Sequence, residues 1–175
     1  LKTGDLVLFD SDNGGFLKIF DSLIKLFTGS NYNHIGMILR DPTYIKEDLK
    51  GLYLYESSWE GTPDPADGKV KLGVQITPLQ EVIKNNKGKI FVRSIICENK
   101  EKYNDTFSPE NILKVYQASN GKPYDIFPKD WIEALFRIDF NPQKEGRFFC
   151  SALVGYLYTK LGVINSTTDW SILRP

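Results

Sequence analysis

One cysteine and one histidine in this chain could together perform nucleophilic chemistry. Cys150 lies within GRFFCSALVGYLY, residues 146–158, near the start of an apolar segment with helical character. A thiolate is the reactive form of cysteine, and a nearby imidazole and a helix N-terminus are the usual means of stabilising it. The backbone N–H groups at this point, including that of Ser151, would also favour an oxyanion. The competing interpretation is a cysteine that only fills the core, as free cysteines often do.

The imidazole must come from His34, because the chain contains a single histidine. His34 follows the turn-rich GSNYN, residues 29–33, and stands at the head of an expected strand. Strand alternation would place its side chain on the same face as Gly36 and Ile38. A lone histidine at such a place is commonly a surface or structural residue, and one histidine argues against a histidine-rich zinc site. The hypothesis of a Cys/His pair therefore depends on where the fold places His34.

A carboxylate that could orient the imidazole follows in LYLYES, residues 52–57. Period-two alternation puts Glu56 on the face that begins with Leu52 and Leu54. A carboxylate on a buried face needs a partner, which an imidazole N–H would provide. The alternative is that Glu56 lies just past the buried part of the strand and is solvated. Glu60, four residues further on, competes for the same role.

Local patterns predict the elements that must position these side chains. Apolar or alternating runs bounded by turn residues predict an antiparallel sheet from residues 4–9, 34–40, 52–58, 73–77 and 89–97. Residues 59–69, WEGTPDPADGK, have the composition of a loop. Amphipathic spacing predicts helices at 14–29, at 108–119 with Ser108 as N-cap and Pro109 in the first turn, at 128–138, and from Cys150 to near Gly162. We expect one α+β domain with helices on one side of a sheet.

Composition excludes several classes of function. Lys and Arg together number 22, as do Asp and Glu, so no net basic charge favours nucleic acid. Two cysteines are too few for a disulfide scaffold, and Cys97 is expected to be a buried strand residue. With no apolar run long enough to span a membrane, we expect a reduced, cytoplasmic setting. The chain begins at Leu1 and not at a methionine, so the sequence leaves open an upstream targeting segment.

The order of six segments resembles a known family. TGDLVLF, SNYNHIGMIL, LYLYESS, GVQITPL, GKPYDIF and FFCSALVGYLY are similar to the circularly permuted NlpC/P60-type, papain-like thiol hydrolases, in particular the YiiX-like and poxvirus-related branch. The resemblance implies one permuted papain-like domain over residues 1–175. It implies a small antiparallel sheet packed against helices, with the histidine strand preceding the cysteine helix. The lecithin:retinol acyltransferase branch, with a second histidine and an Asn-Cys pair, matches less well.

The resemblance also implies roles for individual residues. It places the nucleophile at Cys150, the catalytic histidine at His34 and the third polar residue at Glu56. It brings Tyr124, in GKPYD, near the cysteine helix, where the hydroxyl would assist an oxyanion or bind substrate unless the ring only packs in a turn. Ser151 would contribute its backbone N–H.

The implied activity is cleavage of an amide or ester through an acyl-enzyme, without metal or organic cofactor. A small peptide-like substrate is favoured, and lipid acyl hydrolysis or transfer is the alternative within the enzyme class. From another class, the chain could be a binding module that kept a papain-like groove and lost turnover. Membrane contact has no support beyond the aromatic and aliphatic residues of 14–29, and the oligomeric state stays open.

Overall fold

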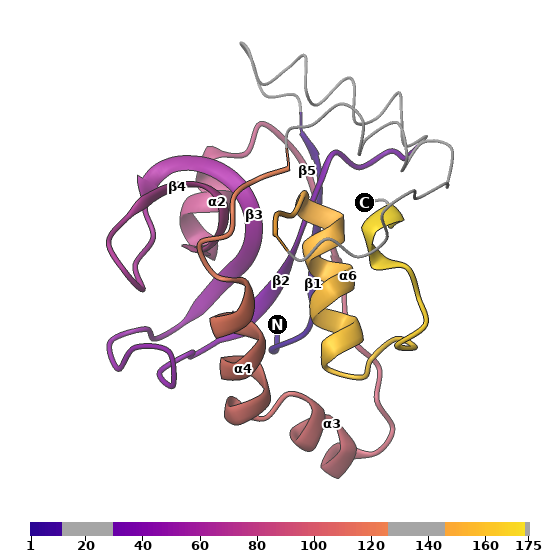
Figure 1. Ribbon diagram of the computed structural model, residues 1–175. Helices are drawn as coiled ribbons and strands as arrows, with labels where there is room; N and C mark the ends of the chain where they lie inside the picture. Colours follow the sequence, from indigo (N-terminus) through magenta and orange to yellow (C-terminus); the bar gives the residue numbers. More distant parts are fainter. Residues whose placement is uncertain (12–29, 126–145, 174–175) are drawn as a thin grey trace.

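The fold is built on a five-stranded antiparallel sheet, seen in a computed structural model that describes residues 1–11, 30–125 and 146–173 (Figure 1). The sheet order is β4-β3-β2-β1-β5. Its strands are β1 Leu6–Ser11, β2 His34–Arg40, β3 Leu52–Pro63, β4 Val70–Pro78 and β5 Gly88–Arg93. The helices are α2 Leu79–Asn85, α3 Lys100–Thr106, α4 Pro109–Ser119 and α6 Cys150–Lys160, with a 3₁₀ turn, η1, at Trp170–Ile172. The expected helices at 14–29 and 128–138 lie outside the described residues.

The hairpin of β3 and β4 is longer than the sequence indicates. The prediction of a loop over residues 59–69 is wrong for residues 59–63, because β3 continues to Pro63, and is confirmed for residues 64–69, which connect β3 to β4 at Val70. Cross-strand pairing holds this extension, with a register shift after Trp59. At its tip Asp64 is fully buried, and its carboxylate accepts a hydrogen bond from Lys71 Nζ at 2.7 Å. The ion pair explains why a segment rich in Pro, Asp and Gly closes a strand hairpin.

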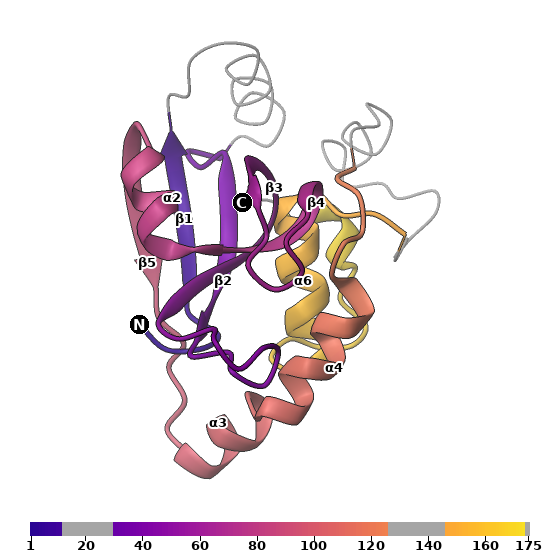
Figure 2. The same cartoon turned by 90° about the vertical axis from the view of Figure 1, so that its left-hand side faces the viewer.

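Helices cover both faces of the sheet. On one face lie α4 and α6 (Figure 2). Their buried side chains form one apolar cluster with Met37, Tyr55 and Ile76 of the sheet. On the other face, Leu79 and Val82 of α2 join a separate apolar cluster with residues of β1, β2 and β3. The expectation of helices on one side only is therefore corrected, because α2 was not predicted. A seven-residue helix that follows a strand directly carries too short a periodic pattern to be recognised.

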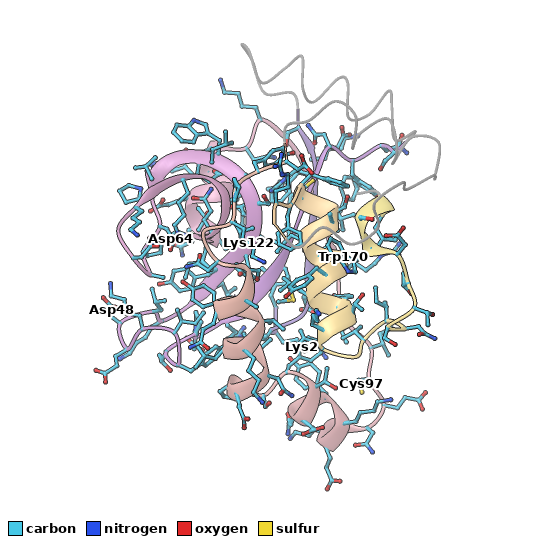
Figure 3. The ribbon with its side chains drawn as sticks, viewed as in Figure 1. Lys2, Asp48, Asp64, Cys97, Lys122 and Trp170 are labelled. Atoms are coloured by element: carbon cyan, nitrogen blue, oxygen red, sulfur yellow. The ribbon has the colours of Figure 1, made fainter. Side chains whose placement is uncertain are left out.

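Cys97 does not lie in a strand. β5 ends at Arg93, where its partner β1 begins, and the chain then leaves the sheet toward α3. Cys97 is half-buried, and its thiol donates to the carbonyl oxygen of Asn99 at 3.2 Å. The prediction of a buried strand residue is thus wrong. Both cysteines are free, and Figure 3 shows Cys97 near α3, away from the start of α6.

The helix that carries Cys150 is held in the core. The α6 side chains from Cys150 to Leu157 are buried. A Cβ at Gly155 would come within 2.9 Å of the Cβ of Trp170, so glycine permits the close approach of η1, where Trp170 lies beside α6 (Figure 3). The predicted start of α4 is confirmed, with Ser108 as N-cap accepting the Asn111 N–H. In the part of the chain that is described, no helix is long and apolar enough to cross a membrane.

Candidate active site

Cys150 is the first residue of α6. The preceding residue, Phe149, has extended dihedral angles of φ −87° and ψ 170°, and no side chain caps the helix. The first N–H groups of a helix lack intrahelical acceptors and carry partial positive charge. The thiol side chain packs with Ile35 and Val154, and only 2 % of the residue is exposed. The start of α6 therefore offers N–H donors without intrahelical acceptors beside a nearly buried sulfur.

The approach to α6 is fixed by hydrogen bonds to Phe148. Its carbonyl oxygen accepts from the Ser57 hydroxyl at 2.6 Å and from the Asp125 N–H at 3.2 Å. Its N–H donates to the carbonyl of Pro123 at 3.2 Å. Since Ser57 is itself fully buried in β3, the sheet and the segment around Pro123 hold the backbone two residues before Cys150.

His34 is fixed at the start of β2. It pairs with Phe9 of β1, and the two ring centroids lie 5.5 Å apart. The preceding residue, Asn33, is buried and forms two hydrogen bonds with the backbone of Ser11. Its Oδ1 accepts from the Ser11 N–H at 3.1 Å, and its Nδ2 donates to the Ser11 carbonyl at 3.0 Å. Through these bonds the Asn33 side chain continues the hydrogen bonding between β1 and β2 beyond the last paired residue. They fix the backbone immediately before His34.

The imidazole meets Glu56 where β2 and β3 stop pairing. The register between these strands ends at Met37↔Tyr55, so residues 34–36 pair only with β1. Nε2 of His34 lies 2.6 Å from Oε2 of Glu56. Glu56 is fully buried, whereas the His34 side chain is 23 % exposed. The alternative of a solvated Glu56 is thereby excluded, and Glu56, not Glu60, makes the hydrogen bond to the ring.

The thiol of Cys150 completes a chain of three side chains. It hydrogen-bonds the His34 imidazole, and because Nε2 faces Glu56, Nδ1 is the nitrogen left for the sulfur. Burial alone lowers the pKa of His34. The hydrogen bonds and charges of Cys150 and then Glu56 outweigh burial and raise this pKa well above the ordinary value of 6.5. The arrangement thus favours a protonated imidazole between two groups that can carry negative charge.

Glu60 lies near this chain without joining it. Burial and then the charge of Glu56 raise the pKa of Glu60, and the charge of His34 and a hydrogen bond with Ser58 oppose them. Glu60 is therefore within electrostatic reach of the imidazole. Glu60 contributes negative charge to the site, while Glu56 makes the hydrogen bond to the His34 ring.

The two residues predicted to bind substrate or an oxyanion, Tyr124 and Ser151, both lie near the start of α6 but make different contacts. The backbone of Tyr124 forms a parallel bridge with Phe148, and its N–H donates to Leu72 at 3.1 Å. Tyr124 is half-buried. The bridge to Phe148 places this segment beside the start of α6. The Ser151 hydroxyl donates to the carbonyl of Leu173 at 2.6 Å, which leaves only its backbone N–H for an oxyanion.

Sequence reasoning missed two residues that position the site, Asn33 and Ser57. Ser57 follows Glu56 on the opposite face of β3, so the same alternation that singled out Glu56 carried the signal for Ser57. For Asn33, the only signal was its place in the turn-rich GSNYN.

The sheet and its helices define an α+β protein with a YiiX-like fold. The chain is similar to the crystal structure of the metalloprotein YiiX from Escherichia coli O157:H7, with a TM-score of 0.55 and 23 % identity, covering 93 % of this chain and 67 % of that one. No family model and no curated protein matches the chain. At this identity the likeness shows the fold alone. Among the described residues, no group of three or more His, Cys, Asp or Glu side chains is placed to hold a metal ion.

Proposed function

We propose that the protein is a thiol hydrolase that cleaves an amide or ester bond through an acyl-enzyme on Cys150. One observation carries the proposal. A thiol at an uncapped helix start hydrogen-bonds an imidazole whose other nitrogen is held at 2.6 Å by a fully buried carboxylate. Nucleophile, base and orienting group in this order are the recurring arrangement of covalent hydrolases.

The geometry suggests a role for each group. His34 takes the thiol proton, and the sulfur attacks the carbonyl carbon of the substrate. The backbone N–H groups at the start of α6 would receive the developing oxyanion. As the C–N or C–O bond breaks, His34 returns the proton to the leaving amine or alcohol. Water, deprotonated by His34, then attacks the thioester, which releases the acid and restores the thiol. Glu56 keeps the ring oriented and stabilises the imidazolium in both half-reactions.

Within this class, a peptidase or amidase acting on a small peptide-like substrate is favoured. The support is the motif order that resembles the permuted NlpC/P60-type, papain-like enzymes, with the histidine strand before the cysteine helix. In the structure β2 precedes α6, as that order requires. Lipid acyl hydrolysis or transfer and a binding module without turnover are alternative outcomes of the test.

Trapping of the acyl-enzyme tests the proposal. The protein is mixed with activated esters of short acyl groups and of amino acids, quenched in acid, and analysed by mass spectrometry of its peptides. We expect a hydroxylamine-sensitive acyl group on Cys150, with none in Cys150→Ala and undiminished labelling in the matched control Cys97→Ala. Turnover without an adduct on Cys150, at an equal rate in Cys150→Ala, would falsify the mechanism. If no ester acylates Cys150 or is turned over, the binding module is favoured.

A further inference from the structure

Glu60 is a half-buried carboxylate that is held in place by hydrogen bonds from neighbouring side chains. Gln75 is 1 % exposed, and its Nε2 donates to both the carbonyl oxygen and the hydroxyl of Ser58, each at 3.1 Å. The Ser58 side chain in turn hydrogen-bonds Glu60. Because the Ser58 oxygen accepts from Gln75, its O–H is left to donate to the carboxylate. This two-step relay from the core holds Glu60 in one place.

The position of Glu60 is electrostatically unfavourable for the free protein. Glu60 follows Glu56 by four residues in β3, and the like charge of Glu56 acts on it. Like charges disfavour one another, and burial adds to the cost. Within residues 1–11, 30–125 and 146–173, no Lys or Arg forms an ion pair with Glu60.

Glu56 carries a second unused acceptor. Its Oε2 binds His34, but Oε1 is buried and has no hydrogen-bond partner among the residues that the structure describes. A buried polar atom without a partner is rare and calls for an explanation. Glu56, with an unused oxygen, and Glu60, held by the Ser58 relay, therefore both act on His34. In the described part of the chain the imidazole is the cation that faces them, and neither carboxylate pairs with a Lys or Arg.

We infer that Glu60, supported by the field of Glu56, determines specificity by binding a protonated primary amine of the substrate next to the scissile carbonyl. The inference rests on the proposed function and narrows its substrate class to amine-bearing acyl groups such as amino acids. An ammonium would donate charge-assisted hydrogen bonds to the carboxylate oxygens and relieve the repulsion between the two carboxylates. A neutral acyl chain would do neither.

Binding to the Cys150→Ala protein tests this inference without turnover. The probes are alaninamide and N-acetylalaninamide, which differ in one ammonium group, and the readout is the single imidazole resonance of His34 near pH 7. We expect alaninamide to bind about tenfold more tightly, the size of one charge-assisted hydrogen bond. Adding Glu60→Gln should bring the two dissociation constants close together, and Ser58→Ala should narrow their ratio in part. The matched control Glu98→Gln, at an exposed site next to Cys97, should keep the full ratio.

The outcomes separate this inference from the proposed function. An unchanged ratio in Glu60→Gln, equal binding of both amides, or no binding of either would overturn the role of Glu60. If Glu60→Gln does not fold, an unchanged ratio of the two dissociation constants in Ser58→Ala would likewise overturn the role of Glu60. If esters with and without an amine acylate Cys150 equally well, the proposed hydrolase activity is supported and the amine preference is contradicted. If alaninamide binds more tightly in a manner that depends on Glu60, but no ester acylates Cys150, the amine site stands and the proposed hydrolase does not.

Discussion

Nε2 of His34 and Oε2 of Glu56 lie 2.6 Å apart at the point where β2 and β3 stop pairing. The carboxylate is fully buried, while the ring keeps part of its surface exposed. The imidazole is thus anchored from the interior of the protein, and its other nitrogen is left for the Cys150 thiol. Each of the following predictions depends on this relationship or on the contacts that maintain it.

Removal of the three side chains should have unequal effects on turnover. We expect Cys150→Ala to abolish hydrolysis and His34→Ala to lower kcat about 10²–10⁴-fold, because general base catalysis is lost. Glu56→Gln should cost less, because the amide oxygen still accepts from the ring but no longer stabilises the imidazolium. The double variant of Cys150 and His34 should be scarcely worse than either single one, since the two act as a unit. Steady-state kinetics on activated esters and amino-acid amides, with folding checked by circular dichroism, measures these effects. Additive losses in the double variant would contradict a shared role.

The single histidine should titrate at a pH well above 6.5. NMR of its ring proton as a function of pH measures this directly. In Cys150→Ala the midpoint should fall, because the largest interaction that raises the pKa is lost. In Glu56→Gln it should fall by a smaller amount. A midpoint that is the same in all three proteins would show that neither partner contacts the ring.

The same shift has a consequence for stability. Because the pKa of His34 is higher in the folded than in the unfolded chain, its contribution to folding is complete below about pH 6.5 and is lost as the pH rises through the folded-state value. Chemical denaturation of the parent and of His34→Gln should therefore show a difference in unfolding free energy that shrinks with rising pH. A difference that grows with pH would mean that folding lowers the pKa of His34 and would contradict the proposed interactions of the ring.

The two cysteines should differ in how their reactivity depends on His34. Iodoacetamide should label Cys150 faster than a model thiol at neutral pH despite its burial, because the imidazole accepts the thiol proton. His34→Ala should slow this labelling at least about tenfold and leave Cys97 unaffected, since Cys97 lies near α3. Mass spectrometry of the labelled peptides separates the two sites. Equal labelling of Cys150 in the parent and in His34→Ala would mean that the thiol is not activated.

Ser57 should matter for the placement of Cys150 beyond its effect on stability. In Ser57→Ala the Phe148 carbonyl loses its 2.6 Å hydrogen bond and keeps only the Asp125 N–H, at a cost of about 1 kcal/mol in unfolding free energy. Because this carbonyl precedes Cys150 by two residues, kcat should fall as well.

The matched control is Ser119→Ala. Ser119 is also fully buried, and its hydroxyl contacts the Val115 carbonyl and the Tyr55 hydroxyl instead. We expect a similar loss of stability with kcat near that of the parent. Equal kcat values in the two serine variants would show that Ser57 is structural only.

Several features could be predicted from the sequence because they depend on near neighbours along the chain. Alternation placed Glu56 on an apolar face and gave β2 its bounds, and the Ser-Pro pair at Ser108 marked the start of α4. The apolar run after Cys150 predicted a helix with the thiol near its start, since helical periodicity is visible over eleven residues. Strand alternation, helical periodicity and capping are local patterns, so they can be recognised without the fold.

The tertiary structure decided what happens between distant segments. The end of pairing at Met37↔Tyr55, which brings His34, Glu56 and Cys150 together, depends on how β3 curves and pairs with β4, and no local pattern contains that information. The same holds for the choice of Glu56 over Glu60, for the hydrogen bond of Ser57 to Phe148, and for the exposure of Cys97 once β5 has lost its partner strand. In each case the outcome is set by hydrogen bonds between residues far apart in the chain, which form only when the sheet and α6 have packed.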